Sequence, residues 1–162
     1  MLNAVFKTEL TANHSAAKDP LGVLRFEYDE TNGGYKVYKY VQAASDTTVA
    51  NGTALAFVNV YGWQVTSDIS DANQNQPAGV GIGAITASYY GWIQVGGYHS
   101  AIKPDAGDDI ADGDSLILHA STDGVVDTTA TGTAAVCKPI GIAVAADNDT
   151  ADTVAGMITC VF

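Results

Sequence analysis

The sequence predicts an all-β protein: a small β-barrel or sandwich built from two similar β-meanders, with an extended N-terminal arm. The composition is rich in Thr and Val, which favour strands, and in Gly, Asp and Asn, which favour turns. Short apolar runs alternate with polar residues and end at turn residues, which is typical of half-buried strands. The second half of the chain also echoes the first. With 162 residues, 47% of them apolar, the chain can bury the core of one domain.

The strand pattern recurs along most of the chain. In order, the expected strands lie within residues 37–44, 49–58, 78–87, 89–102, 110–120, 138–146 and 153–162. The dipeptides Asn51-Gly52 and Asp112-Gly113 precede apolar runs and provide the positive φ angles that tight hairpin turns need. The last segment is expected to be a closing strand at the C-terminus.

Two glycine-containing motifs support an internal repeat. Gly52 in "VANGTAL" corresponds to Gly113 in "IADGDSL", 61 positions later by subtraction, and Gly81 in "VGIGAI" corresponds to Gly141 in "PIGIAV", 60 positions later. Two copies are too few for a solenoid, which needs about three units to bury its faces. Two meanders that close on each other fit a small barrel or sandwich better.

The segment "YYGWIQVGGYH", residues 89–99, is the richest in aromatic residues. On a strand, Trp92, Gln94 and Gly96 would share one face, and Ile93 and Val95 would share the other. A pocket wall and a subunit contact both have this pattern. We expect a subunit interface, formed by Tyr89, Tyr90, Trp92, Gln94 and Tyr98.

The charge is uneven along the chain. Residues 1–39 carry five basic and five acidic side chains, whereas residues 40–162 carry thirteen Asp against two Lys and account for the net charge of −11. A surface this acidic repels phosphate backbones and anionic lipids, so we expect neither nucleic-acid nor membrane binding. The first residues lack the pattern of a secretory signal, and no apolar run reaches the length of a transmembrane helix.

No motif predicts catalysis. The glycine run at Gly79, Gly81 and Gly83 leads into another strand pattern, whereas a phosphate-binding loop needs a helix after it. The three histidines are far apart and match no metal-ligand spacing. We therefore expect no enzyme activity, no cofactor and no metal.

Two further features have structural explanations. The acidic loop Asp105–Asp114 could offer oxygen ligands to Ca²⁺, but its spacing is not that of an EF-hand, and Asp-rich turns are common. We expect a turn there. Cys137 and Cys160 are expected to be buried free thiols, with a disulfide between paired strands as the alternative.

Four motifs follow one another in the chain: "AGVGIGAITASYYGWIQVGGY", "GDSLIL", "PIGIAVAA" and the final "TVAGMITCVF". In this order they resemble the decoration, or cement, proteins of tailed-phage capsids. The resemblance covers about residues 35–162, and Tyr38–Ala43 ("YKYVQA") is its leading edge.

This resemblance implies a β-rich structural protein of the virion. Such a protein binds the outer surface of the icosahedral head as a homotrimer, contacts the phage major capsid protein and stabilises the shell. It is assembled in the host cytoplasm and needs no cofactor. Two other functions stay open: another virion part, such as a head-fibre base, a tail component or an adhesin, and a carbohydrate-binding module that stacks sugars on the aromatic residues of 89–98.

Residues 1–34 are interpreted as an N-terminal arm and linker, and residues 35–162 as the β-domain. An apolar strip opens the arm, and the expected capsid-binding residues are Leu2, Val5, Phe6, Lys7 and Leu10. The hypothesis is that this arm is mobile in the free protein and adds a strand to a sheet of the capsid protein. The alternative is a terminal segment packed on the protein's own core.

Overall fold

A computed structural model describes residues 6–58, 63–69, 76–107, 109–128, 138–146 and 153–160. All regular structure in these ranges is strand, which confirms the all-β prediction, and none of it is a helix that could cross a membrane. The strands are β1 (Leu24–Tyr28), β2 (Tyr35–Ala43), β3 (Ala54–Phe57), β4 (Gln64–Thr66), β5 (Pro77–Gly81), β6 (Tyr90–Ile102), β7 (Ser115–Leu118), β8 (Val126–Thr128), β9 (Gly141–Ala143) and β10 (Val154–Thr159).

Five strands form a closed barrel. They follow the order β2–β4–β3–β5–β6, and β6 pairs back with β2. The β2–β4 pairing is parallel and the other pairings are antiparallel. Apolar side chains from each wall fill the interior, among them Val41, Leu55, Val65, Val80 and Ile93, all fully buried.

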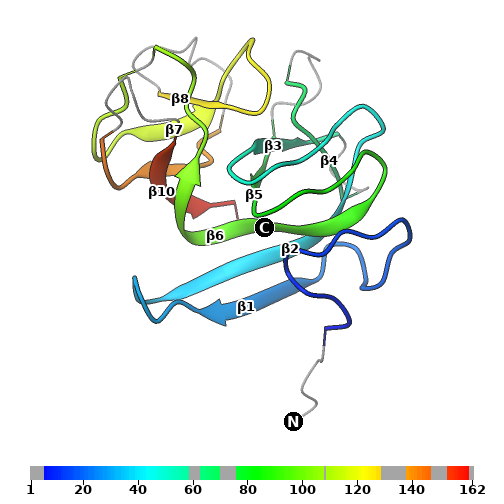
Figure 1. Cartoon of the computed structure of the whole chain (residues 1–162). Helices are drawn as coiled ribbons and strands as arrows, with labels where there is room; N and C mark the ends of the chain where they lie inside the picture. Colours follow the sequence, from blue (N-terminus) through cyan, green and yellow to red (C-terminus); the bar gives the residue numbers. More distant parts are fainter. Residues whose placement is uncertain are drawn as a thin grey trace.

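The long strand β6 continues beyond this barrel into a second group of strands. Its C-terminal half pairs with β10, and the order continues β10–β9–β7–β8. An isolated parallel bridge between Pro104 and Val126 joins β8 back to the chain just after β6. Figure 1 shows the two groups on one side of β6, with β3–β5 at the right and β7, β8 and β10 at the left.

The two groups share one plan, which confirms the predicted internal repeat. β3 pairs with β4 at Phe57–Val65, and β7 pairs with β8 at Leu118–Val126, 61 positions later by subtraction. The parallel contacts of the two groups, β2 with β4 and Pro104 with Val126, are also equivalent. The repeat is therefore a duplicated strand arrangement, and β6 serves as the last strand of one unit and the first of the next.

One predicted correspondence within the repeat is wrong. Gly52 donates its N–H to the carbonyl of Gly81 (2.8 Å), and Gly113 donates to that of Ala143 (3.0 Å). The structural counterpart of Gly81 is therefore Ala143, and not Gly141 as the sequence comparison suggested. The offset between the two units is 61 residues from Gly52 to Gly113 but 62 from Gly81 to Ala143, whereas the sequence comparison used an offset of 60 for Gly81.

The true counterpart of Gly141 is Gly79, and both are required by close backbone approach. A Cβ on Gly79 would lie 2.4 Å from the carbonyl oxygen of Gln94, and a Cβ on Gly141 would lie 2.3 Å from that of Met157. At each of these positions the neighbouring strand lies so close that any side chain would overlap its backbone.

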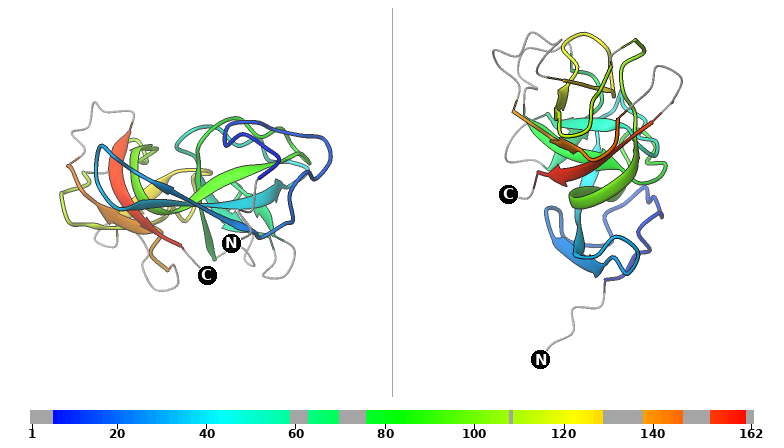
Figure 2. Two further views of the ribbon diagram at one scale, coloured as in Figure 1. Left: turned by 90° about the horizontal axis from the view of Figure 1, so that it is seen from below. Right: turned by 90° about the vertical axis from the view of Figure 1, so that its left-hand side faces the viewer.

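The described part of the N-terminal region lies on the barrel. β1 pairs with β2 over five residues, from Leu24–Lys39 to Tyr28–Tyr35. Figure 2 shows the β1–β2 hairpin projecting from β6 on the side away from β10. The boundary proposed at residue 34 thus falls in the turn between two paired strands.

We expect Gly141→Ala to reduce the free energy of unfolding by about 1–3 kcal/mol, because the new methyl group overlaps a backbone carbonyl that cannot move without shifting β10. Gly83→Ala is the matched control, since its nearest neighbour would lie 3.6 Å away. Urea denaturation of both variants measures the difference. Equal stability of the two would show that the close approach at Gly141 is not a constraint.

Candidate assembly surface

Two of the residues predicted at a subunit interface lie inside the chain's own fold. Trp92 is 1% exposed and packs against Tyr40 (ring centroids 5.1 Å apart) and Phe6 (5.2 Å). Gln94 is also buried, and its side-chain amide donates to the carbonyls of residues 96, 97 and 98. These two residues are thereby removed from the candidate interface. Alternation along β6 identified their common face but not the segment that covers it.

That covering segment is residues 6–23. Its apolar side chains Phe6, Leu10, Leu21 and Val23 pack on the cluster formed by Tyr38, Tyr40 and Trp92. A chain of buried hydrogen bonds fixes it: the indole N–H of Trp92 donates to Thr8 Oγ1 (2.8 Å), which donates to Asp19 Oδ2 (2.6 Å). The backbone N–H of Lys7 donates to the same carboxylate (3.1 Å).

The expected capsid-binding residues divide into two groups. Leu2 and Val5 lie outside the described residues, and Lys7 is exposed. Phe6 and Leu10 are half-buried against the aromatic cluster. This is the arrangement that the alternative interpretation expects, a terminal segment packed on the protein's own core. An arm that left this position would expose Trp92.

The tyrosines of the predicted interface are partly accessible. Tyr89 is 36% exposed, and Tyr90 is half-buried, where it forms an isolated bridge with His14. Tyr98 is half-buried and lies opposite Met157 of β10.

The strand pairings place Tyr98 on a larger surface. Residues paired across antiparallel strands share a face, as do residues two apart on one strand. The pairs Tyr28–Tyr35 and Phe26–Val37 place one group of side chains on a common face of β1 and β2. The pairs Tyr98–Met157 and Met157–Ile142 place a second group on a common face of β6, β10 and β9. The register shift at Val37 and the positive φ of Gly97 lie between the two groups. We call the two groups together the apolar face: Phe26, Tyr28 and Tyr35 on β1 and β2, and Tyr98, Met157 and Ile142 on β6, β10 and β9.

The apolar face is accessible to an unusual degree. Tyr28, Tyr35 and Phe26 are 62%, 63% and 59% exposed, and Ile142 and Met157 are each more than two-fifths exposed. Tyr28 and Tyr35 contact each other edge to face, with ring centroids 5.6 Å apart. Single exposed apolar residues need no explanation, but exposed apolar side chains that are grouped together mark an interaction surface.

Sequence reasoning missed most of this face. Residues 24–28, "LRFEY", alternate apolar with charged side chains and precede the turn "DETNGG", which is a hairpin signal. The interpretation of residues 1–34 as an arm does not predict this strand. Ile142 and Met157 lie on short strands whose pairing partners cannot be inferred locally.

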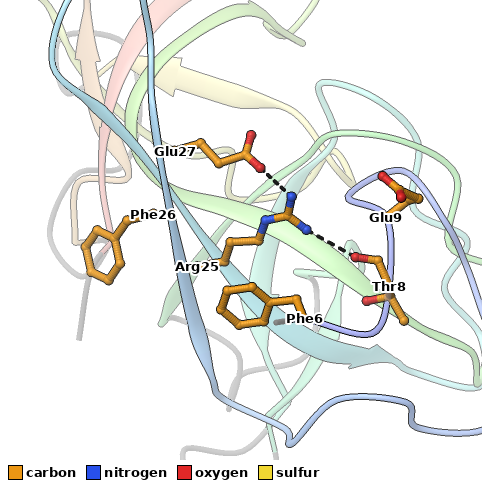
Figure 3. Close-up of a pocket in the computed structure, with 6 residues that line it drawn as sticks. All are labelled: Phe6, Thr8, Glu9, Arg25, Phe26 and Glu27. Atoms are coloured by element: carbon orange, nitrogen blue, oxygen red, sulfur yellow. Dashed lines mark hydrogen bonds and ion pairs between the residues drawn. The ribbon is translucent and has the colours of Figure 1, made fainter. Parts of the chain in front are cut away.

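β1 also borders a shallow groove of about 380 Å³ between itself and the N-terminal segment. Figure 3 shows the residues that line it: Phe6, Thr8, Glu9, Arg25, Phe26 and Glu27. Arg25 donates to the carbonyl of Thr8 (3.1 Å), forms an ion pair with Glu27 and lies 5.5 Å from the Phe6 ring. Arg25 thus links β1 to the N-terminal segment.

The turn of the β1–β2 hairpin is held by Asp29. Its carboxylate accepts hydrogen bonds from the side chain of Asn32 (3.0 Å) and the backbone N–H groups of Thr31 and Asn32, and it pairs with Lys36 (3.0 Å). The Asn32 amide and the Lys36 ammonium hold the pKa of Asp29 well below its usual range. The ionised carboxylate therefore stabilises the hairpin that presents β1.

Several polar groups that could have formed a site are structural. Lys39 is buried in the barrel, with its ammonium 4.9 Å from the Trp63 ring centroid, and burial lowers its pKa. Burial also lowers the pKa of His99, whose Nε2 lies 3.3 Å from the carbonyl of Gly81. Cys160 is a buried free thiol, as predicted, and burial raises its pKa to about 12; Cys137 lies outside the described residues.

The glycine run and the acidic loop are strand and turn structure in the described residues. Gly79 and Gly81 belong to β5, and the chain runs from there to β6 with no helix in the described residues between them. In the acidic loop, Asp114 accepts a hydrogen bond from the backbone of Ala111 (2.9 Å), and Asp105 lies 3.6 Å from His119. Within the described ranges no three His, Cys, Asp or Glu side chains cluster as metal ligands do.

Comparison with known proteins gives one structural likeness. No protein-family model matches the sequence, and no curated protein matches it. The N-terminal base of the head fiber protein gp8.5 of bacteriophage phi29 is similar with a TM-score of 0.46 and 20% sequence identity, over 78% of this chain and 96% of that one. A likeness at this level does not assign a function.

We expect Thr8→Val to lower the free energy of unfolding by about 1–3 kcal/mol, because the buried Trp92 N–H loses its acceptor and the Asp19 carboxylate loses one of its hydrogen bonds. Thr8→Ser keeps the hydroxyl and is the control. Thermal unfolding followed by tryptophan fluorescence gives the comparison. If both variants lose the same stability, the methyl group of Thr8 matters and the hydrogen bonds do not.

The Asp29 turn predicts an acid-sensitive hairpin. Because its pKa is lower in the folded state, its contribution to stability is complete above the unfolded pKa of about 3.9 and is lost as the pH falls further. Asp29→Asn should melt at a lower temperature than the wild type at pH 7, and the difference between the two melting temperatures should be smaller at about pH 2–3. Melting temperatures measured across this range provide the test; a difference that does not depend on pH would contradict it.

Proposed function

We propose that this protein is a structural component of a tailed-phage virion that attaches through its apolar face to the outer surface of the head and stabilises the shell. The observation that carries the proposal is the two groups of exposed apolar residues, one on β1 and β2 and one on β6, β10 and β9. A protein with net charge −11 is otherwise well suited to remaining dispersed, so this surface indicates a specific partner.

The charge distribution supports attachment at this end of the molecule. The face includes β1 and the first half of β2, which belong to the charge-balanced residues 1–39. The acidic remainder of the chain would face solvent, where like charges on neighbouring copies repel one another least in salt. A homotrimer at the three-fold positions of the head is the assembly that the sequence resemblance implies.

The resemblance of residues 35–162 to capsid decoration proteins provides the virion as the setting. A head-fibre base is the second candidate, and it would use the same face to attach to the head. A bound decoration protein adds only its own domain to the head surface, whereas a bound head-fibre base also carries a fibre that projects from it. Negative-stain images of heads incubated with the purified protein separate them.

Head binding itself can be tested with one variant on the apolar face. Met157→Glu should abolish co-sedimentation with expanded heads of the phage that encodes the protein, because binding would bury the new carboxylate without a partner. Ser121→Glu adds the same charge to an exposed turn away from this face and should bind as wild type does. Equal binding of both variants would remove the apolar face from the proposal, and no binding by wild type would remove the proposal itself.

A further inference from the structure

Strand β1 has an open edge. Every other strand in the described part of the chain is paired on both sides, by the closure of the first barrel or by the Pro104–Val126 bridge of the second group. Among the described residues, β1 pairs with β2 alone. Edge strands of this kind are sites where another strand can add, and natural proteins protect them unless they are used.

The backbone groups that point to this open edge are those of Leu24, Phe26 and Tyr28. Hydrogen-bonded positions alternate along an antiparallel strand. The N–H of Asp29 donates to Gly34 (3.0 Å), and the carbonyl of Val23 accepts from Tyr40 (3.1 Å), so residues 23, 25, 27 and 29 face β2. The residues between them therefore direct their N–H and C=O groups outward.

The side chains of β1 are complementary to a second copy of the same strand. If two β1 strands run antiparallel with Phe26 at the centre, Arg25 lies opposite Glu27 of the other copy, twice. Leu24 then lies opposite Tyr28, and Phe26 lies opposite its own equivalent. We propose that β1 pairs in this register with β1 of a second copy about a two-fold axis.

This register satisfies the backbone as well. Each of the three outward residues donates one hydrogen bond and accepts one, which gives six hydrogen bonds across the pair. The two Arg25–Glu27 contacts fall at positions without backbone hydrogen bonds, where opposed side chains come closest. A register centred on Tyr28 would instead oppose Glu27 and Asp29, two carboxylates, so charge selects the centre at Phe26.

The pairing extends the apolar face and does not block it. Phe26 and Tyr28 of each copy lie on the same side of the combined sheet as Tyr35. The contact is also compatible with copies at three-fold positions of a head, because adjacent three-fold positions of an icosahedral lattice are related by two-fold axes. The inference goes beyond the proposed function and can be tested without any virus.

The first test is the mass of the purified protein in solution. We expect the mass measured by light scattering to rise with concentration to twice that of the smallest species. Glu27→Arg should raise the concentration needed for this doubling at least about tenfold, because two guanidinium groups would then oppose each other at both contacts. Glu30→Arg makes the same charge change in the exposed turn beyond β1 and should leave the doubling intact. A wild-type mass that never doubles, or one that Glu27→Arg leaves unchanged, overturns the proposal.

Mixing two variants excludes a folding defect as the cause. Arg25→Glu and Glu27→Arg should each fail to pair alone, yet associate when mixed, because every carboxylate then faces a guanidinium. Arg25 also bonds Thr8, so the variant's fold is checked by near-ultraviolet circular dichroism.

Amide hydrogen exchange of the wild type provides a readout that needs no variant. The N–H groups of Leu24, Phe26 and Tyr28 should become protected as concentration rises, whereas those of Arg25 and Glu27 should be protected throughout. Exchange at the three outward positions that does not depend on concentration would contradict strand pairing.

Discussion

Strand β6 is the element on which the rest of the structure depends, because it belongs to both groups of strands. Its first half closes the barrel against β2 and β5, and its second half carries β10 and, through β10, the remaining strands. The pairing register shifts between Val37 and Tyr38, opposite the middle of β6, so one residue is left over where the two roles meet. The buried amide of Gln94 bonds three carbonyls at this point and satisfies the backbone that the ladder leaves.

The sharing of β6 also explains where the apolar face comes from. Closing a sheet into a barrel removes its edges and buries one side of every strand. β1 and the first half of β2 extend past the barrel, so the side chains that would continue its interior, Phe26, Tyr28 and Tyr35, are more than half exposed in the described part of the chain. The second group, Tyr98, Met157 and Ile142, lies on the outward side of β6, β10 and β9. The exposed surface therefore follows from the strand arrangement and is not a scatter of isolated residues.

How far the sequence predicts this structure depends on how local each signal is. The strands and their turns follow from alternation and from Asn-Gly and Asp-Gly pairs, and the repeat follows from comparing segments of one chain. The burial of Trp92 cannot be predicted from such local patterns, because the hydroxyl that accepts its N–H belongs to Thr8, far away in sequence. The role of β1 was missed for the same reason: its alternation was visible, but whether its apolar side would be covered depends on every other strand. The glycine correspondence failed by two residues, since only the hydrogen bonds of Gly52 and Gly113 define the alignment.

The central claim is that this protein assembles through the face formed by β1, β2, β6, β10 and β9. A cryo-electron microscopy reconstruction of heads carrying the bound protein tests it most directly, because the orientation of the barrel relative to the shell can be read from the density. The account predicts that Tyr35, Met157 and Ile142 are buried against the head and that the turns of the acidic second unit face solvent. A reconstruction in which these three side chains are exposed, with the head contacted by another part of the chain, would contradict it.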